Sequence, residues 1–359
     1  MLGCHPCGDE STSGYWKGVD WLLEAEGFQC WLVNARGVKN VPGRPKTDRQ
    51  DAIWLAKLAE RGMCRPSFVP PKPIRQLRNL TRYRKAQIDE RGREAQRLDK
   101  VLQDAGVKLS SVATDIQGRS ARDMLEALVA GERDPEVLAQ FARGRMRDKR
   151  PQLEEALAGR FGAHHALLVR TILAKLDFLE AAIDQLSREI DKVIAPFETE
   201  LGLLRTIPGV ERRAAETILA EIGADMSRFP TAGHLASWAG MCPGNHESAG
   251  KQRGGRSRQG SKWLGAVLAE AAAAAGHSKG TYLGAQHRRL RARIGYAKAN
   301  KAVGHSILVA CWHVLSKGSP YEDLGADWFI RRRPEAHARR LARQIEALGF
   351  VVTVTPPAA

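Results

Sequence analysis

The sequence has 359 residues, and its 56 Lys and Arg residues against 40 Asp and Glu residues give a formal net charge of +16, which indicates a polyanionic partner. No apolar run approaches the ~18 residues of a membrane-spanning helix, and the first residues lack the apolar core region of a signal peptide. We therefore expect nucleic acid and no membrane as the partner. Six scattered cysteines form no disulfide framework, which indicates a reducing cytoplasm, and the length predicts two or three domains.

Residues 1–66 are predicted to form an α/β domain. The apolar spacing of residues 15–26 predicts an amphipathic helix, and the run FQCWLV at 28–33 predicts a short buried strand. A loop rich in Gly, Pro and basic residues follows, and residues 48–60 again have helical spacing. The segment RPSFVPPKP contains four prolines and indicates a linker at the end of this domain.

The second predicted helix begins with two acids. Thr47 is a suitable N-cap, so Asp48 and Asp51 fall on one face of the first turn. Two interpretations stay open on these residues alone. Acids are favourable at the positive N-terminus of any helix. Alternatively, the two carboxylates hold a divalent cation such as Mg²⁺, while Arg44 and Lys46 in the preceding loop contact a nucleic-acid backbone.

Residues 67–198 are predicted to be helical. The segment begins with a basic stretch that has no acid between residues 70 and 88. We expect this stretch to bind nucleic acid through Arg75, Arg78 and Arg82, because clustered cations neutralise phosphates.

A heptad seam lies in the second half of this helical region. Apolar residues from Val169 to Val193 alternate steps of three and four without a break. This pattern predicts a coiled-coil hairpin or a coiled-coil dimer. A single amphipathic helix packed on a globular core has the same pattern and stays open as the alternative.

Residues 199–330 are predicted to form a second, all-helical domain. Two helices flank a turn at Pro208 and Gly209, which is the spacing of a helix-hairpin-helix. Such a turn exposes backbone N–H groups that can bind phosphate, and a plain αα-hairpin is the alternative.

The loop PGNHESAGKQRGGRSRQGSKW in this domain is rich in Gly, Ser and Arg, and we expect it to be mobile. Residues 249–301 contain 12 Lys and Arg residues and a single acid, which favours a phosphate-binding surface. The loop residues that we assign to nucleic acid are Lys251, Arg253, Arg256 and Arg258. Residues 331–359 are predicted to add a tail helix and a terminal strand.

Four motifs together resemble a known family. The segments ESTSGYW, KTDRQDA, IPGV…ILAEIG and WAGMCPG…ESAGKQRGG…GSKWL occur in the order found in the "IS one-ten" family of insertion-sequence transposases. The resemblance extends from Glu10 to about residue 350. No single motif is specific, but four in family order make the match strong.

The resemblance implies an RNase H-type, RuvC-like domain with the acidic pattern D-E-D-D, followed by a domain with a serine nucleophile. It implies a recombinase that assembles as a homo-oligomer on DNA in a bacterial cytoplasm, at the nucleoid, guided by a structured bridge RNA and assisted by divalent metal. Matching the motifs residue by residue makes Glu10 the second acid and Asp48 and Asp51 the third and fourth. Ser248 becomes the nucleophile, with Ser257 and Ser261 as outside candidates.

The first aspartate of that pattern has no counterpart here. In the family it lies on an opening strand well upstream of the glutamate, whereas Met1 is only nine residues before Glu10. The lead MLGCHPCGDE is also rich in Gly, Cys and Pro, which predicts a poor strand. We therefore expect an N-terminally truncated chain with an incomplete RuvC-like sheet. Its function is then an RNA-guided serine recombinase, an inactive nucleic-acid-binding remnant, or a metal-dependent RuvC-like nuclease in which Ser248 is a loop serine.

Overall fold

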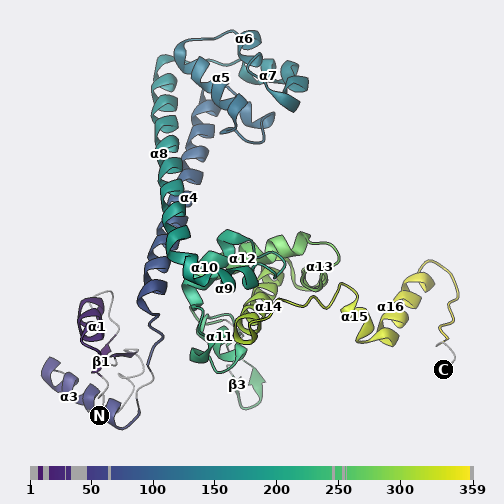
Figure 1. The fold of residues 1–359 in the computed structure, drawn as a ribbon. Coiled ribbons are helices and arrows are strands. Elements are labelled where there is room, and N and C mark those ends of the chain that lie inside the picture. Colours follow the sequence, from purple (N-terminus) through teal and green to yellow (C-terminus); the bar gives the residue numbers. More distant parts are fainter. Residues whose placement is uncertain are drawn as a thin grey trace. The chain divides into compact units, whose positions relative to one another are not determined.

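The computed structural model describes residues 7–10, 16–28, 30–33, 47–63, 66–244, 247–252, 255 and 257–355 (Figure 1); at 7–10, 48, 51, 247, 248 and 252 it describes the backbone alone. The helices are α1 (Trp16–Ala25), α3 (Asp48–Glu60), α4 (Lys72–Asp104), α5 (Arg119–Ala130), α6 (Pro135–Ala139), α7 (Arg150–Leu157), α8 (Ala163–Ile194), α9 (Glu198–Leu204), α10 (Arg212–Ile222), α11 (Ala232–Trp238), α12 (Lys262–His277), α13 (Tyr282–Ile294), α14 (Tyr296–Lys317), α15 (Trp328–Arg331) and α16 (Pro334–Glu346); the strands are β1 (Cys7–Glu10), β2 (Cys30–Val33), β3 (Glu247–Ser248) and β4 (Lys251–Gln252). The chain divides into two compact units, Met1–Lys72 and Pro73–Ala359.

The first unit contains a parallel strand pair joined through a helix. Strands β1 and β2 pair in register from Cys7 with Cys30 to Glu10 with Val33, and α1 lies between them in the chain. Parallel neighbours need such a crossover, so β1–α1–β2 is a βαβ unit, as the predicted helix and strand suggested. Helix α3 packs against β1, and Leu58 joins Val33 in a small apolar core.

The strand β1 corrects one expectation. Its residues were predicted to form a poor strand, yet Cys7–Glu10 pairs along its whole length with β2. Leu32 and Val33 of β2 are buried, and pairing with a buried neighbour outweighs weak local propensity. The parallel α/β arrangement is therefore observed, while the assignment to the RuvC-like fold stays a prediction.

Helices α4 and α8 of the second unit form a long antiparallel hairpin (Figure 1). Cross-helix contacts join Asp104 to His165 near one end and Arg84 to Ser187 toward the other, which fixes the antiparallel direction. Five of the eight predicted seam positions are buried, and the other three are half-buried; the buried ones are Val169, Leu176, Leu179, Ile183 and Ile190. The heptad seam of α8 thus faces a partner helix of the same chain, the hairpin form of the predicted coiled coil.

The six helices from α9 to α14 form the second helical domain. The segment between α11 and α12 contains Ser248 and is called the serine-bearing loop. Helix α12 contacts α10, α13 and α14, and its alanine run is its packing face: Ala271, Ala272 and Ala275 are buried. Small side chains let neighbours come close to its backbone. A Cβ at Gly209 would lie 2.3 Å from the Ala271 carbonyl oxygen, so only glycine fits there.

The C-terminal tail differs in part from expectation. Helix α16 forms as predicted, but residues 351–355 have no regular secondary structure, so the predicted terminal strand is wrong. An apolar stretch becomes a strand only where another strand edge pairs with it. Among the described residues, no helix is both long and apolar enough to cross a membrane.

Candidate functional site

Ser248 lies at the tip of a β-hairpin. Strands β3 and β4 are antiparallel, and Ser248 pairs with Lys251 as the last pair before the turn. The two turn residues, Ala249 and Gly250, have φ values of 51° and 73°. Two left-handed residues in a two-residue loop are typical of a type I′ turn, whose twist suits a hairpin. The loop that was predicted to be mobile therefore contains a regular hairpin at Ser248.

Ala249 is strained. Within the described ranges it is the one non-glycine residue with a positive φ. The left-handed region costs an L-residue about 1–2 kcal/mol, because its Cβ approaches the following carbonyl oxygen. Such outliers gather at functional sites, where the surrounding structure holds them. The strain lies next to the residue that the resemblance assigns as nucleophile.

The serine-bearing loop is anchored where it rejoins the helices. A Cβ at Gly260 would lie 2.0 Å from the Ala239 carbonyl oxygen, so the loop end passes directly over the end of α11. Ser261 then caps α12, since its hydroxyl oxygen accepts the Leu264 N–H at 3.3 Å. The same hydroxyl donates to Glu221 Oε2 at 2.9 Å. Both hydrogen-bonding roles of Ser261 are thus structural.

Glu221 is the buried centre of this anchor. It is 1% exposed, near the end of α10, and its carboxylate accepts from Arg82 Nε at 2.7 Å and Nη2 at 2.9 Å. Arg78 donates to the backbone oxygens of Ala220 and Glu221 at 2.9 and 2.6 Å. Burial, opposed by the charge of Glu221, lowers the pKa of Arg78 to about 10, so it stays charged at neutral pH.

Two cations assigned to nucleic acid therefore have partners within the protein. Arg78 and Arg82 hold α4 against α10, and Arg75 is half-buried on the same helix. A second buried pair, Arg84 with Glu216 at 2.6 Å, joins the same two helices. The sequence reasoning missed both acids. The signal was present, because Glu216 and Glu221 are flanked by apolar residues in the second half of α10, where a buried charge needs a partner.

The three predicted metal-binding acids can be followed through the backbone. Glu10 ends β1, and α3, which packs on β1, starts at Asp48 with Thr47 as N-cap in an extended conformation. The predicted N-cap position is correct, although the Thr47 side chain makes no capping hydrogen bond. Asp48 and Asp51 share one face of the first turn. A set of carboxylates is the kind of hard oxygen donor that suits Mg²⁺. Arg44 and Lys46 lie outside the described residues.

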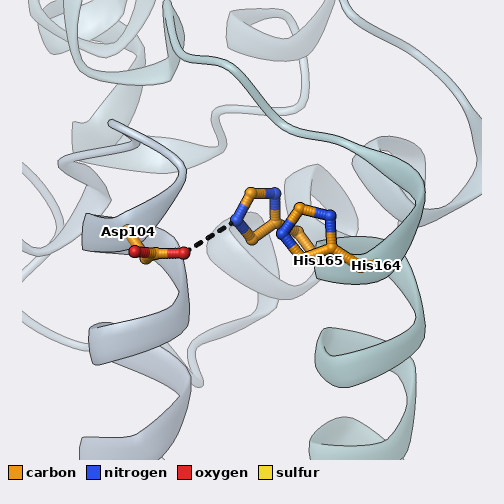
Figure 2. Close-up of side chains that lie close together, drawn as sticks. All are labelled: Asp104, His164 and His165. Atoms are coloured by element: carbon orange, nitrogen blue, oxygen red, sulfur yellow. Dashed lines mark hydrogen bonds and ion pairs between the residues drawn. The ribbon is translucent and has the colours of Figure 1, made fainter.

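A second cluster of possible metal ligands lies where α4 ends and α8 begins (Figure 2). Ligand atoms of Asp104, His164 and His165 lie within 4.8 Å of one another. His165 Nδ1 accepts the Gly162 N–H at 3.0 Å, so the proton of the neutral ring is on Nε2, 3.1 Å from Asp104 Oδ2. Both ring nitrogens of His165 are occupied, which makes this cluster a hydrogen-bonded link between the two helices.

The remaining predicted nucleic-acid contacts are spread over the helical domain. Lys251 and Arg258 are exposed, while Arg253 and Arg256 lie outside the described residues. Pro208 and Gly209 form the turn between α9 and α10, with Gly209 at φ 87° and packed on α12. Close packing on one side leaves only the other side of the turn for a phosphate. The helix-hairpin-helix function stays a prediction.

Two family models match separate parts of the chain. The DEDD transposase model of IS110 elements, described as "Transposase", matches residues 5–106, and the model described as "Transposase IS116/IS110/IS902 family" matches residues 201–288. The chain belongs to this family of transposases. A curated relative, a "Probable family 20 transposase" of Pseudomonas aeruginosa, is 24% identical over 328 residues, covering 89% of this chain and 85% of the relative.

Membership in the IS110 family identifies the polyanion that the composition predicted. A transposase acts on DNA, which accounts for the net charge of +16. The DEDD match includes β1, α1, β2, α3 and α4, so all three predicted metal-binding acids fall within it. A DEDD domain indicates divalent-metal dependence. The second match begins within α9, covers α10 to α12 and ends within α13, with the Ser248 hairpin inside it.

Proposed function

We propose that this IS110-family transposase cuts and rejoins DNA through the hydroxyl of Ser248, with a divalent cation, Mg²⁺, held by Glu10, Asp48 and Asp51. The observation that carries the proposal is the position of Ser248 at a hairpin tip, followed by the strained Ala249. An anchored hairpin with a backbone outlier is a way to present one side chain in a fixed position.

Cutting and rejoining without an added energy source requires a nucleophile that keeps the phosphate in a phosphodiester linkage after the DNA bond breaks. Ser248 Oγ forms a bond to phosphorus, the bond from phosphorus to the leaving deoxyribose oxygen breaks, and the serine proton ends on that oxygen. In the reverse step, the hydroxyl of a new strand end attacks the same phosphorus and the bond to Ser248 Oγ breaks. This rejoins the DNA without another energy source. A serine hydroxyl is a weak nucleophile at neutral pH and needs activation by a base or a metal. When bound, the cation supplies polarisation of a phosphodiester.

The nucleic-acid partners follow from the exposed charge and the motif resemblance. Lys251 in β4 lies directly opposite Ser248, and Arg258 is exposed near the loop end. These cations can neutralise phosphates beside the reacting one. A structured guide RNA that selects the DNA, and assembly as a homo-oligomer on it, are proposed from the resemblance to the family.

The test is formation of a covalent protein–DNA adduct on a nicked suicide substrate, with guide RNA and Mg²⁺ present. We expect the parent protein and Ser257→Ala to form the adduct, and Ser248→Ala to form none. Ser257 is the control serine of the same loop: its removal leaves the proposed nucleophile in place, so it can slow adduct formation but should not abolish it. An adduct that persists in Ser248→Ala, or that disappears in Ser257→Ala, contradicts the proposal.

A further inference from the structure

A pocket of about 460 Å³ lies at the base of the loop that carries Ser248. Its lining comes from both ends of the loop, with Met241 and Pro243 on the entering side and Ser257 on the leaving side. Gly255 of the loop also lines it, and helices α13 and α14 supply the rest. The volume falls within the ~300–1,000 Å³ of small-molecule sites, and it is larger than a single phosphate needs.

One face of α14 gives the pocket its charge. Lys298, Lys301 and His305 line it at steps of three and four residues, which places them on one side of the helix. The opposite side of α14, with Val303 and Ile307, is buried in the core. No carboxylate is among the lining residues that the structure describes, so the pocket is positive.

The two lysines are available to an anion. In the part of the chain that the structure describes, neither Lys298 nor Lys301 forms an ion pair. Lys301 Nζ donates to the Gly240 carbonyl oxygen at 3.3 Å, which holds the ammonium at the pocket; among the described residues its other two donors have no partner. Burial and the nearby Lys301 lower the pKa of His305, so the charge is carried by the lysines.

Part of the pocket lining is apolar. Met241 and Pro243 present a thioether and a ring, and Ala302 adds a methyl group from α14. A phosphate alone uses only the lysines, whereas a nucleotide uses both parts of the lining, with its phosphate on the cations and its sugar and base on the apolar part.

We propose that this pocket binds one nucleotide of the DNA strand that reacts with Ser248, with its phosphate on Lys298 and Lys301 and its sugar and base against Met241 and Pro243. The inference rests on the proposed function, since that function places a DNA strand at the hairpin. A nucleotide held at the base of the loop fixes the strand relative to the loop tip. The pocket is thus a positioning site for substrate, separate from the reacting hydroxyl.

The probe is a 5′-phosphorylated thymidine trinucleotide, titrated into the full chain by calorimetry across a salt series. Lys298→Ala and Lys301→Ala should each weaken binding about tenfold. Each should also reduce the slope of log affinity against log salt by about 0.7, because one phosphate contact is lost. Ala302→Phe, which fills the pocket without changing charge, should abolish binding. The matched control is Lys279→Ala, an exposed lysine outside the pocket, which should leave affinity unchanged.

The inference fails if Lys279→Ala weakens binding as much as Lys298→Ala, if folded Ala302→Phe binds the trinucleotide normally, or if the parent does not bind it. A ribo-trinucleotide bound more tightly than the deoxy form would overturn the assignment to DNA. Ser248→Ala separates this inference from the proposed function: it should bind the trinucleotide like the parent while forming no adduct. If the adduct forms but trinucleotide binding does not depend on the pocket residues, the pocket inference is contradicted and the proposed function is not.

Discussion

Arg82 of α4 and Glu221 of α10 form a bidentate ion pair, with 2.7 Å between Nε and Oε1 and 2.9 Å between Nη2 and Oε2. Planar guanidinium and carboxylate groups fix each other's orientation in this arrangement. Because Ser261 also donates to Glu221, the pair joins three elements: α4, α10 and the start of α12. The end of the serine-bearing loop is therefore held by the long helix of the coiled-coil hairpin.

Glu221→Gln is expected to slow adduct formation as well as destabilise the fold. The change removes the charge that holds Arg82 and weakens the contact to Ser261, and charged hydrogen bonds are worth about 1.5–3 kcal/mol each. Glu216→Gln is the matched control, since Glu216 is 2% exposed and pairs with Arg84 across the same helices without touching Ser261. Both variants should lose thermal stability. At temperatures well below melting, only Glu221→Gln should form the adduct more slowly than the parent. Equal rates of adduct formation in the two variants would contradict the role of the anchor.

Ala249→Gly is expected to stabilise the Ser248 hairpin. Glycine adopts φ near 51° without the Cβ conflict, and relief of about 1 kcal/mol corresponds to roughly fivefold slower amide exchange in residues 247–252. Gly250→Ala is the opposite control: a Cβ there meets nothing within 4 Å, so only the φ of 73° matters, and exchange should speed up. Changes of the same sign in both variants would show that turn conformation does not control the hairpin.

Acid should weaken the coiled-coil hairpin. Hydrogen bonds first from Arg93 and then from Lys175 lower the pKa of Glu90 to about 2, and Lys175 is the main cause of the lowered pKa of Glu94. A depressed folded-state pKa stabilises the fold above the unfolded value of about 4.3 and loses that contribution as pH falls toward 2. We expect the difference in melting temperature between the parent and Lys175→Met to shrink between pH 5 and pH 2. A constant difference would contradict this origin of stability.

The acidic site is tested by calorimetric titration with Mg²⁺ and Mn²⁺. Asp48→Ala and Asp51→Ala should each weaken metal binding about tenfold or more, as expected when a ligand is lost. The control is Glu335→Ala, which removes an exposed acid from the first turn of α16. Metal binding that is unchanged in Asp48→Ala would favour the simpler interpretation, in which first-turn acids only suit the helix N-terminus.

Local periodicity predicted the helices well. The helix predicted over 48–60 is α3, and the heptad seam gave α8, because spacing along one segment determines which face is apolar. The strand β1 could not be predicted this way. Its Gly and Cys residues have weak propensity, and its stability comes from β2, whose partner residues lie 23 positions further along the chain.

The same limit applies to the charged residues of the candidate site. Arg82 resembles a free cation in sequence, since no acid occurs between residues 70 and 88, yet its partner Glu221 is 139 residues away. Composition counts the charges but does not say which are neutralised inside the fold. Ser248 was found through the motif resemblance, whereas the strain at Ala249 and the face of α14 required three-dimensional structure.

The central claim, that Ser248 is the nucleophile, is tested most directly by mass spectrometry of the residue that carries DNA. The parent protein is trapped on a suicide substrate with guide RNA and Mg²⁺, digested with protease and nuclease, and the modified peptide is sequenced. The account predicts one nucleotide linked to Ser248. A nucleotide on Ser257 or Ser261 would contradict it, and so would cleavage that yields only free 3′-hydroxyl and 5′-phosphate ends, the products of a nuclease that uses water.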